Sequence, residues 1–203
     1  EKEIEVIHNF VDVKRFHKQP VDAFRKLISP NGEKILVHAS NFRKVKRVED
    51  VVSVFLRIQE KIPATLLLLG DGPERSEIEA RARKCESHNN IKFLGKQEQM
   101  EDILPIADLF LLTSEYESFG LAALEAMAAE VPVISTNAGG LPEINIDGYS
   151  GFMSNVGDVE NMSRNALHIL QDAETLRKFK TNALAQAKKF DIENIVPLYE
   201  ALY

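Results

Sequence analysis

Two glutamates, Glu117 and Glu125, bracket the stretch ESFGLAALE, which holds a Ser-Phe-Gly turn and the start of an alanine-rich segment. Carboxylates accept hydrogen bonds from paired hydroxyl groups, such as those of a sugar. We predict that Ser118 is the N-cap of a helix beginning near Phe119. Gly120 lacks a Cβ, so an anion can approach the unpaired N–H groups of that first turn. Phosphate donors between two hydroxyl acceptors indicate a nucleotide sugar.

A purely structural role for these two glutamates also stays open at this point. Glu117 can simply cap the turn, and Glu125 can be a surface residue of the helix.

A basic cluster in the stretch ASNFRKVKRVED provides a second candidate site. Arg43, Lys44, Lys46 and Arg47 follow directly after an apolar run, in a chain whose net charge is −6. Such a cluster in an acidic protein favours an anion, such as a phosphate, as its ligand. The alternative is a solvated run of surface charge.

Three further turns are rich in glycine. The stretch LGDGPER lacks the third glycine of a dinucleotide-binding fingerprint, so it is a weak motif, and a tight turn is enough to explain its glycines. In FLGKQEQME, Gly95 exposes backbone beside Lys96. In STNAGGLPE, Gly139 and Gly140 precede a carboxylate, and a plain left-handed turn explains them equally well.

The elements that must position these turns alternate along the chain. Apolar, β-rich runs cover 34–40, 64–70, 90–95, 108–114, 131–137 and, more weakly, 151–155. Their centres are continuously apolar, which predicts strands buried on both faces. Helical patterns over 48–61, 73–87 (with Pro73 in the first turn) and 121–130 lie between them. The fold class is therefore α/β, a Rossmann-like parallel sheet with helices on both faces, followed by C-terminal helices over 158–172, 173–189 and 192–203.

Composition narrows the class of protein. The chain has 203 residues, of which 44% are hydrophobic and 28% charged, as in a globular domain. The acidic balance argues against a nucleic-acid or membrane-surface partner, and no run approaches a membrane span. The single cysteine, Cys85, forms no internal disulfide and favours the cytoplasm. The chain starts without Met or a signal peptide, so we expect a fragment of a longer protein; a homo-oligomer remains open.

These turns, in this order, resemble a known family. ESFGLAALE, then EAMAAEVPVISTNAGGLPE, then DGYSGF is similar to the C-terminal half of a retaining GT-B glycosyltransferase of the family 4 type. VIHNFVDVKRF is similar to the interdomain linker of that family, so the resemblance spans the chain. Within the family, ASNFRKVKRVEDVV and VIHNFVDVKRFHK are most similar to enzymes that join N-acetylglucosamine to L-malate in bacillithiol biosynthesis.

The resemblance implies a role for each charged residue of the site. Arg43 and Lys46 would bind the donor diphosphate and stabilise the leaving group. Glu117 would hold hydroxyls of the transferred sugar, and Glu125 would hold those of the ribose. The family commonly has an arginine five residues before the lysine, where this chain has Asn41. The main diphosphate arginine is therefore open between Arg43 and Arg47.

The resemblance also assigns backbone contacts. N–H groups around Ser118, Phe119, Gly120 and Leu121 would meet the phosphates and the sugar. The segment that holds Phe93, Gly95 and Lys96 would flank the uracil.

We expect no metal and no cofactor other than the UDP-sugar donor. The chain has no D-x-D run, and positioned cations with N–H groups can stabilise a departing diphosphate without proton transfer. No Ser/His/Asp set is present, and each of the five histidines is expected to be structural, with His38 at the edge of the core.

The predicted organisation has three parts. Residues 1–20 form an interdomain linker, residues 21–190 the donor-binding domain, and residues 191–203 a helix that packs on a missing N-terminal domain. That domain would hold L-malate, so this chain would bind UDP or UDP-GlcNAc but be inactive alone. Two alternatives remain: another acceptor (an inositol phosphate, a sugar or a lipid-linked sugar), or a non-catalytic nucleotide-binding module that prefers NAD or ATP.

Overall fold

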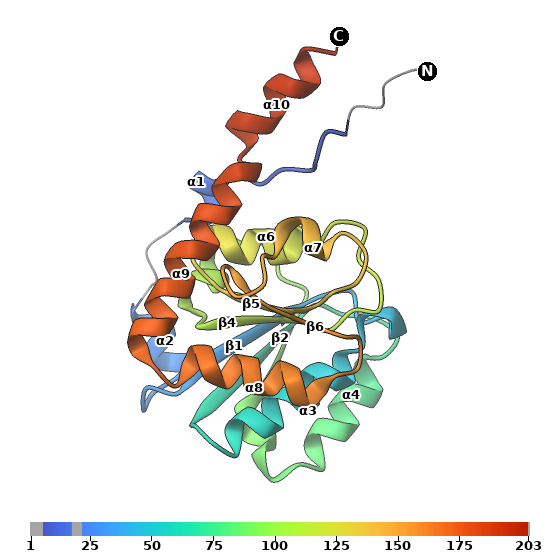
Figure 1. Ribbon diagram of the computed structural model, residues 1–203. Helices are drawn as coiled ribbons and strands as arrows, with labels where there is room; N and C mark the ends of the chain where they lie inside the picture. The colour runs from blue at the N-terminus through green and yellow to red at the C-terminus, as the bar shows by residue number, and fades with distance from the viewer. Residues whose placement is uncertain (1–5, 18–21, 203) are drawn as a thin grey trace.

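The computed structural model describes residues 6–17 and 22–202, and a six-stranded parallel sheet is its centre (Figure 1). The order across the sheet is β3-β2-β1-β4-β5-β6. The strands are β1 (Lys34–Ala39), β2 (Ala64–Leu69), β3 (Ile91–Gly95), β4 (Leu109–Leu112), β5 (Val133–Thr136) and β6 (Gly151–Ser154). Each strand falls inside an apolar run that predicted it, and the Rossmann-like α/β class is confirmed.

The order of the strands places a switch point between β1 and β4. The chain goes outward from β1 to β2 and β3, then returns to add β4 on the other side of β1. The turns after β1 and β4 therefore leave the same edge of the sheet in opposite directions. Ligands of open α/β sheets bind in the crevice that forms at such a point.

One face of the sheet is covered by α3 (Val48–Gln59), α4 (Arg75–Arg83) and α8 (Val159–Leu170). Their apolar stripes pack on alternate strand residues such as Leu66 and Leu109. The helix predicted to start at Pro73 begins later, at Arg75, because the backbone of Glu74 serves as its N-cap. The prediction that Pro73 lies just inside that helix is therefore wrong.

The opposite face carries α1 (Val13–Phe16), α2 (Asp22–Ile28), α5 (Met100–Ile103), α6 (Leu121–Ala128), α7 (Leu141–Ile144) and most of α9 (Ala173–Ala187). The helices fold onto strand residues that point the other way, such as Val37 and Phe110. Leu176 and Phe179 of α9 pack instead with the apolar residues under α3, α4 and α8, so α9 passes along the edge of both layers.

A buried carboxylate ties together the edge of the sheet where the strands begin. Asp108 Oδ2 accepts hydrogen bonds from Ile35 N at 2.9 Å and from Arg25 Nη2 at 2.8 Å. Lys180 Nζ lies 3.8 Å from Asp108 Oδ1. This ion cluster lies at the end of the sheet opposite the switch-point turns. It therefore joins the layers of the fold without contacting those turns.

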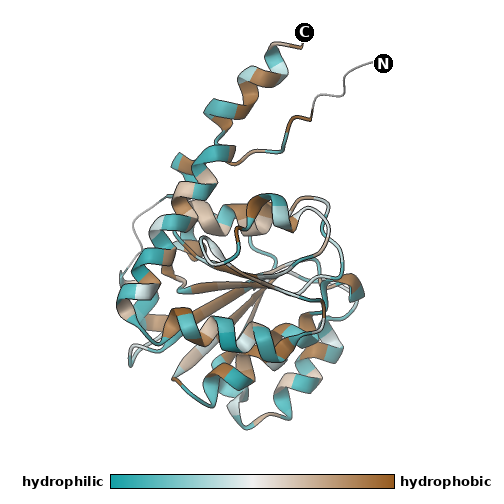
Figure 2. Ribbon diagram, in the orientation of Figure 1, coloured by the Kyte–Doolittle hydropathy of each residue, from teal (hydrophilic) through white to brown (hydrophobic). Residues whose placement is uncertain are grey.

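The two ends of the described chain run side by side. Val11 and Asp191 form a parallel bridge, and Tyr199 Oη lies 3.4 Å from the carbonyl oxygen of Ile7. Helix α10 (Ile192–Glu200) projects from the body with this N-terminal segment, and hydrophobic stretches alternate along it (Figures 1 and 2). Leu198 and Leu202 are exposed there. Residues 1–5 and 18–21 of the predicted linker and of the start of the domain lie outside the described residues.

Within the described residues, no helix has both the length and the apolar character that crossing a bilayer requires.

Candidate functional site

A pocket of about 300 Å³ opens at the carboxyl ends of β1 and β4, where the switch point lies. Residues of the turn after β1, of the turn after β4 and of the N-terminal segment converge on it. Its lining consists of Asn9, Ala39, Ser40, Asn41, Lys46, Leu112, Glu117, Ser118, Phe119, Gly120, Leu121 and Ala122. Residues of the basic turn after β1 and of the stretch ESFGLAALE after β4 therefore line one pocket.

An ion pair spans this pocket. Lys46, at the end of the 3-10 helix η1 (Lys44–Lys46), places Nζ 2.6 Å from Glu117 Oε1. The same carboxylate oxygen accepts a hydrogen bond from Ser114 Oγ at 2.8 Å. Less than a fifth of either charged side chain is exposed, with Lys46 at 19% and Glu117 at 13%. Glu117 thus does more than cap a turn: it holds the main cation of the pocket.

The N-terminus of α6 faces the same space. Gly120 is its N-cap, with a left-handed backbone (φ +99°), and no side chain caps the helix. The first hydrogen bonds within the helix are donated by the N–H groups of Ala123 and Leu124, and both go to the carbonyl oxygen of Gly120. The preceding N–H groups, at the pocket-lining Leu121 and Ala122, have no carbonyl a turn earlier and can serve an anion. The prediction of Ser118 as N-cap is wrong, because the chain turns two residues later than expected.

The glycines after β5 support the Glu117 loop from behind. A Cβ on Gly139 would lie 1.9 Å from the carbonyl oxygen of Glu117, and one on Gly140 would lie 2.5 Å from that of Ser118. Gly140 N also donates to the Glu117 carbonyl at 2.8 Å. These glycines are therefore needed for close backbone contact, which fixes the position of the pocket loop.

The glycines after β2 have a matching task. A Cβ on Gly70 would lie 1.8 Å from the carbonyl oxygen of Ser40, and one on Gly72 would lie 1.9 Å from that of Asn41. These two glycines, which partly resemble a dinucleotide-binding fingerprint, thus allow the backbone of the turn after β2 to pack closely against the backbone of the turn after β1.

A second pocket, of about 360 Å³, adjoins the first. Both are lined by Ala39 and Ser40, and the second continues over β2 and the turn after β3. The remaining lining residues are Leu69, Gly70, Lys96, Gln97, Glu98 and Met100. Lys96 therefore reaches the site region, whereas Phe93 packs on the α3, α4 and α8 side of the sheet. Gly95 (φ +67°) makes the turn and accepts a hydrogen bond from Gly70 N at 2.7 Å.

The predicted cations separate into three environments. Lys46 lines the first pocket, whereas Arg43 is exposed at the N-cap of η1 and lines neither pocket. Arg47 pairs with Asp50 Oδ2 at 2.7 Å and with Glu115 Oε1 at 3.0 Å. Asn41, which stands where the family commonly has an arginine, does line the first pocket.

Glu125 lies on α6 one turn beyond Leu121. Burial raises its pKa; Arg15 nearby lowers it, and Glu101 raises it. Its carboxylate is therefore a half-buried group with a charged neighbourhood, not an ordinary surface glutamate of a helix.

Phe119 and His8 show how the N-terminal segment joins the site. The Phe119 side chain is buried and stacks on His8, with ring centroids 6.1 Å apart, so mainly its backbone faces the pocket. His8 Nδ1 also lies 3.3 Å from Glu143 Oε2. The next residue, Asn9, lines the pocket and was missed by sequence reasoning; its place in the linker-like stretch VIHNF was the available signal.

His38 is buried beneath the pocket. Its ring nitrogens lie 2.9 Å from the Leu111 carbonyl oxygen and 2.8 Å from Ser40 Oγ. Burial lowers its pKa to about 4, with a smaller lowering by Lys46; the Leu111 contact and Glu117 oppose this. It is a neutral, structural histidine, as predicted, although it lies inside the core instead of at its edge.

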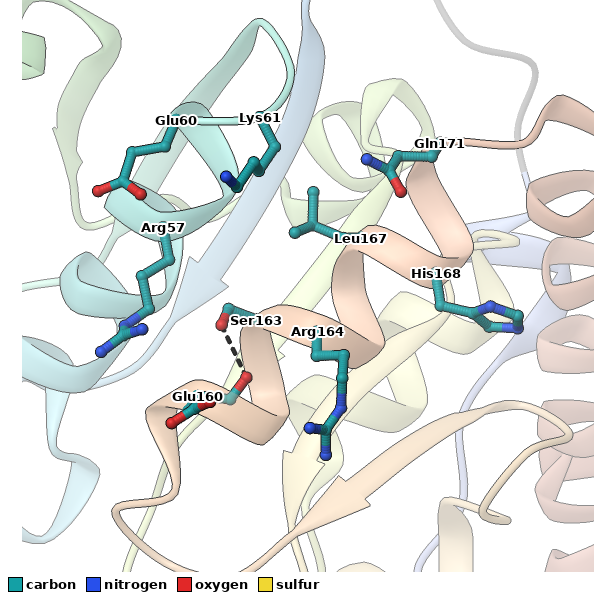
Figure 3. Close-up of a pocket in the computed structure, with 9 residues that line it drawn as sticks. All are labelled: Arg57, Glu60, Lys61, Glu160, Ser163, Arg164, Leu167, His168 and Gln171. Atoms are coloured by element: carbon teal, nitrogen blue, oxygen red, sulfur yellow. Dashed lines mark hydrogen bonds between the residues drawn. The ribbon is translucent and has the colours of Figure 1, made fainter.

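A larger pocket of about 440 Å³ lies elsewhere, between α3 and α8 (Figure 3). Figure 3 shows polar side chains on two helices, with Arg57, Lys61 and Arg164 among them, and Ser163 Oγ donating to the Glu160 carbonyl. Its lining residues belong to α3, to α8 and to the positions just after these helices, so the described part of this pocket has no strand-to-helix turn in its lining.

The fold and the site together place the chain in a family. Residues 22–186 match the family described as glycosyl transferases group 1, and the chain belongs to it. The six-stranded parallel sheet with helices on both faces is the C-terminal domain of a GT-B glycosyltransferase.

Three relatives show the likeness. The chain is 41% identical, over 204 residues, to N-acetyl-alpha-D-glucosaminyl L-malate synthase of Bacillus anthracis, and covers 54% of that protein. It superposes on Anabaena HepE, solved in complex with UDP-glucose, with a TM-score of 0.88 at 25% identity (98% of this chain, 57% of that one). For sucrose-phosphate synthase from Thermosynechococcus elongatus the TM-score is 0.87 at 28% identity (98% and 51%). The chain spans about half the length of the curated relatives it matches.

Proposed function

We propose that this chain is the donor-binding domain of a retaining glycosyltransferase that transfers N-acetylglucosamine from UDP-GlcNAc to L-malate. The observation that carries the proposal is the pairing of Lys46 with Glu117 at the open N-terminus of α6. The 41% identity with a GlcNAc–malate synthase supports the particular sugar and acceptor.

The first pocket has the groups that the donor's diphosphate and sugar need. A diphosphate there would take the Lys46 ammonium as its partner, together with the N–H groups of Leu121 and Ala122. Glu117, released from Lys46, would then accept hydrogen bonds from sugar hydroxyls. The same cation would stabilise the charge that builds on UDP as the glycosidic bond breaks.

We propose that the second pocket receives the nucleoside. It extends from Ala39 and Ser40 toward Lys96, so a ligand that fills both pockets would be long and would turn around the end of β1. Glu125 would accept the ribose hydroxyls, and the turn after β3 would flank the uracil. Asn41 lines the first pocket where Arg43 does not, so we propose that Asn41 and Lys46 face the diphosphate and that Arg43 contributes only long-range charge.

Calorimetric titration of the chain with UDP, UDP-GlcNAc, ADP and NAD tests the proposal. We expect UDP and UDP-GlcNAc to bind, and Glu125→Ala to weaken both by about tenfold or more, because a half-buried charged acceptor is lost. The matched control is Glu174→Ala, which removes an exposed carboxylate of α9 outside both pockets. Preference for NAD or ADP, unchanged by Glu125→Ala, would contradict donor binding and support the non-catalytic module.

The acceptor needs the complete protein. We expect transfer from UDP-GlcNAc to L-malate, in the presence of a chelator, because Lys46 and the α6 N–H groups supply the positive charge that a metal would otherwise give. Turnover with an inositol phosphate, a sugar or a lipid-linked sugar, but not with L-malate, would keep the fold assignment and replace the acceptor. A cytoplasmic setting remains part of the proposal.

The projecting end of the molecule fits an N-terminal domain as partner. Val6, Leu198 and Leu202 are 71%, 45% and 61% exposed, on two segments that run together. We propose that α10 packs on the acceptor domain and that the chain alone is inactive.

A further inference from the structure

Two hydroxyl side chains follow directly after β4, at the edge of the sheet where the first pocket lies. Thr113 and Ser114 are 1% and 0% exposed. The strand before them pairs with β1 on one side and with β5 on the other, and all of its residues are buried. The two hydroxyls are therefore held by the core of the sheet and can serve as fixed points for the turns around them.

The Thr113 hydroxyl reaches the turn after β1. Its Oγ1 donates to the carbonyl oxygen of Lys46 at 3.0 Å and to that of Arg47 at 2.9 Å. A hydroxyl group has a single hydrogen, so the two carbonyl oxygens share it in a three-centre hydrogen bond. The backbone of Lys46, the cation of the first pocket, is thereby tied to the end of β4.

The backbone of this turn requires such a constraint. Phe42 and Arg47, which lie on either side of η1, have left-handed backbones (φ +38° and +47°), although neither residue is a glycine. A residue with a Cβ adopts that conformation only at a cost in free energy, so other contacts must hold it there. The Thr113 hydroxyl supplies one of these contacts at the Arg47 carbonyl.

Glu115 adds two contacts to the same turn. Its N–H group donates to the Val45 carbonyl at 2.8 Å, and its Oε1 lies 3.0 Å from Arg47 Nη1. The Glu115 side chain is 47% exposed, and an ion pair open to water constrains its partner only weakly. The Thr113 contact is buried, and a buried carbonyl that loses its hydrogen-bond donor is costly to the fold.

The next residue acts on the other member of the ion pair. Ser114 Oγ donates at 2.8 Å to Glu117 Oε1, the same oxygen that accepts from Lys46 Nζ. Thr113 thus fixes the backbone that carries the cation, and Ser114 fixes the carboxylate. The separation of 2.6 Å between Lys46 Nζ and Glu117 Oε1 is therefore set from one place, the end of β4.

We propose that Thr113 is a positioning residue of the donor site: its hydroxyl, shared between the Lys46 and Arg47 carbonyls, holds the Lys46 ammonium group where the donor's diphosphate binds. The inference deepens the proposed function and rests on it, because it takes the diphosphate as the ligand of Lys46. It makes the affinity for the nucleotide depend on a side chain that lines neither pocket of the site.

Calorimetric titration of Thr113 variants with UDP tests this role. Thr113→Val keeps the shape of the side chain but removes the hydroxyl, and it should weaken UDP binding by about fivefold, the worth of one hydrogen bond. Thr113→Ser keeps the hydroxyl and should bind UDP as tightly as the wild type, with a lower urea midpoint because a buried methyl group is lost. Thr113→Ala compared with Thr113→Ser gives a second pair if valine prevents folding. The stoichiometry of each titration reports the folded fraction, so loss of folded protein is not mistaken for loss of affinity.

A double variant separates positioning of the cation from general support of the fold. Because Thr113 acts through Lys46, Thr113→Val should cost no further affinity in a Lys46→Ala background. The matched control is Thr65→Val, which removes a buried hydroxyl (3% exposed) from β2, in register with Ile35 at the opposite end of the sheet, and should leave UDP binding unchanged. Unchanged binding in Thr113→Val, or an equal loss with and without Lys46, would overturn the inference; so would an equal loss in Thr65→Val.

A readout without ligand keeps the inference distinct from the proposed function. Nitrogen-detected NMR should show the hydrogens of the Lys46 ammonium group exchanging with water more slowly in the wild type and in Thr113→Ser than in Thr113→Val, because Glu117 holds them only when the turn is fixed. Equal exchange rates in all three proteins would overturn the inference even where UDP binds. Absence of UDP binding by the wild type, together with faster exchange in Thr113→Val, would instead count against the proposed function alone.

Discussion

Lys46 Nζ and Glu117 Oε1 lie 2.6 Å apart and join the turn after β1 to the turn after β4. Each is the group best suited to one part of a nucleotide sugar, yet in this structure they satisfy each other. A ligand must therefore exchange one charged contact for two new ones. In the proposed complex, the donor phosphate would take over the cation, and the sugar would take over the carboxylate.

The first prediction concerns the cation. Lys46→Ala should weaken UDP binding about tenfold or more, because a charge-assisted hydrogen bond to phosphate is lost. Lys44→Ala is the matched control, since Lys44 is exposed in the same short helix and does not line the first pocket. Calorimetry with both variants checks this; an equal loss in the two would mean that only the net charge of the turn matters.

The second prediction separates the sugar from the nucleotide. Glu117→Gln should lower the affinity for UDP-GlcNAc relative to UDP, since only the former carries hydroxyls for Glu117. The affinity for UDP should stay the same or rise, because Lys46 no longer has to leave a carboxylate. Glu115→Gln, which affects only the Arg47 pair, serves as control. A parallel loss for both ligands would contradict the assigned role of Glu117.

The third prediction concerns the glycine behind the pocket loop. Gly139→Ala should destabilise the fold and weaken UDP binding, because its Cβ would meet the Glu117 carbonyl and its φ is +61°. Gly32→Ala carries the same left-handed penalty, with φ +82°, but meets nothing within 4 Å. The control should cost only about 1–2 kcal/mol and leave UDP binding intact. Urea unfolding and calorimetry of both variants distinguish strain from displacement of the loop.

The fourth prediction is a pH dependence of stability. His38 titrates at about 4 in the folded protein, below its ordinary 6.5, mainly because burial disfavours the charged ring. The unfolded chain binds the extra proton first, so His38's contribution is complete above pH 6.5 and is lost as the pH falls toward 4. Across this pH range, the free energy of unfolding should fall by roughly 3 kcal/mol because of His38.

Urea unfolding between pH 4.5 and 7.5 measures this slope. His38→Gln should flatten it, whereas His88→Gln, at an exposed position, should leave it unchanged. A slope that persists in His38→Gln would assign the acid sensitivity to carboxylates instead.

The parts of the fold that sequence predicts are those set by local pattern. The run 64–70 is mostly apolar, because a central parallel strand is buried on both faces, and β2 lies inside that run. The convergence of Lys46 and Glu117 follows from the same reasoning, since parallel strands end at one edge. Neither inference requires knowledge of side-chain packing.

What the sequence does not give depends on contacts between distant turns. Gly120 and not Ser118 begins α6, because the glycine must pass Leu141: a Cβ there would lie 2.7 Å from Leu141 Cδ2. Asn9 reaches the first pocket only because the N-terminal segment folds back onto α6. No spacing rule connects residues at the start of the chain to a helix more than a hundred positions later.

The pairing of Val11 with Asp191 has a mechanical consequence. The N-terminal segment and the segment that leads into α10 leave the domain side by side, paired to each other. A second domain joined to both segments would therefore be connected by two adjacent chain segments instead of one. We expect this paired connection to allow bending between the two domains but to resist rotation about its length, because rotation would have to break the pairing of Val11 with Asp191.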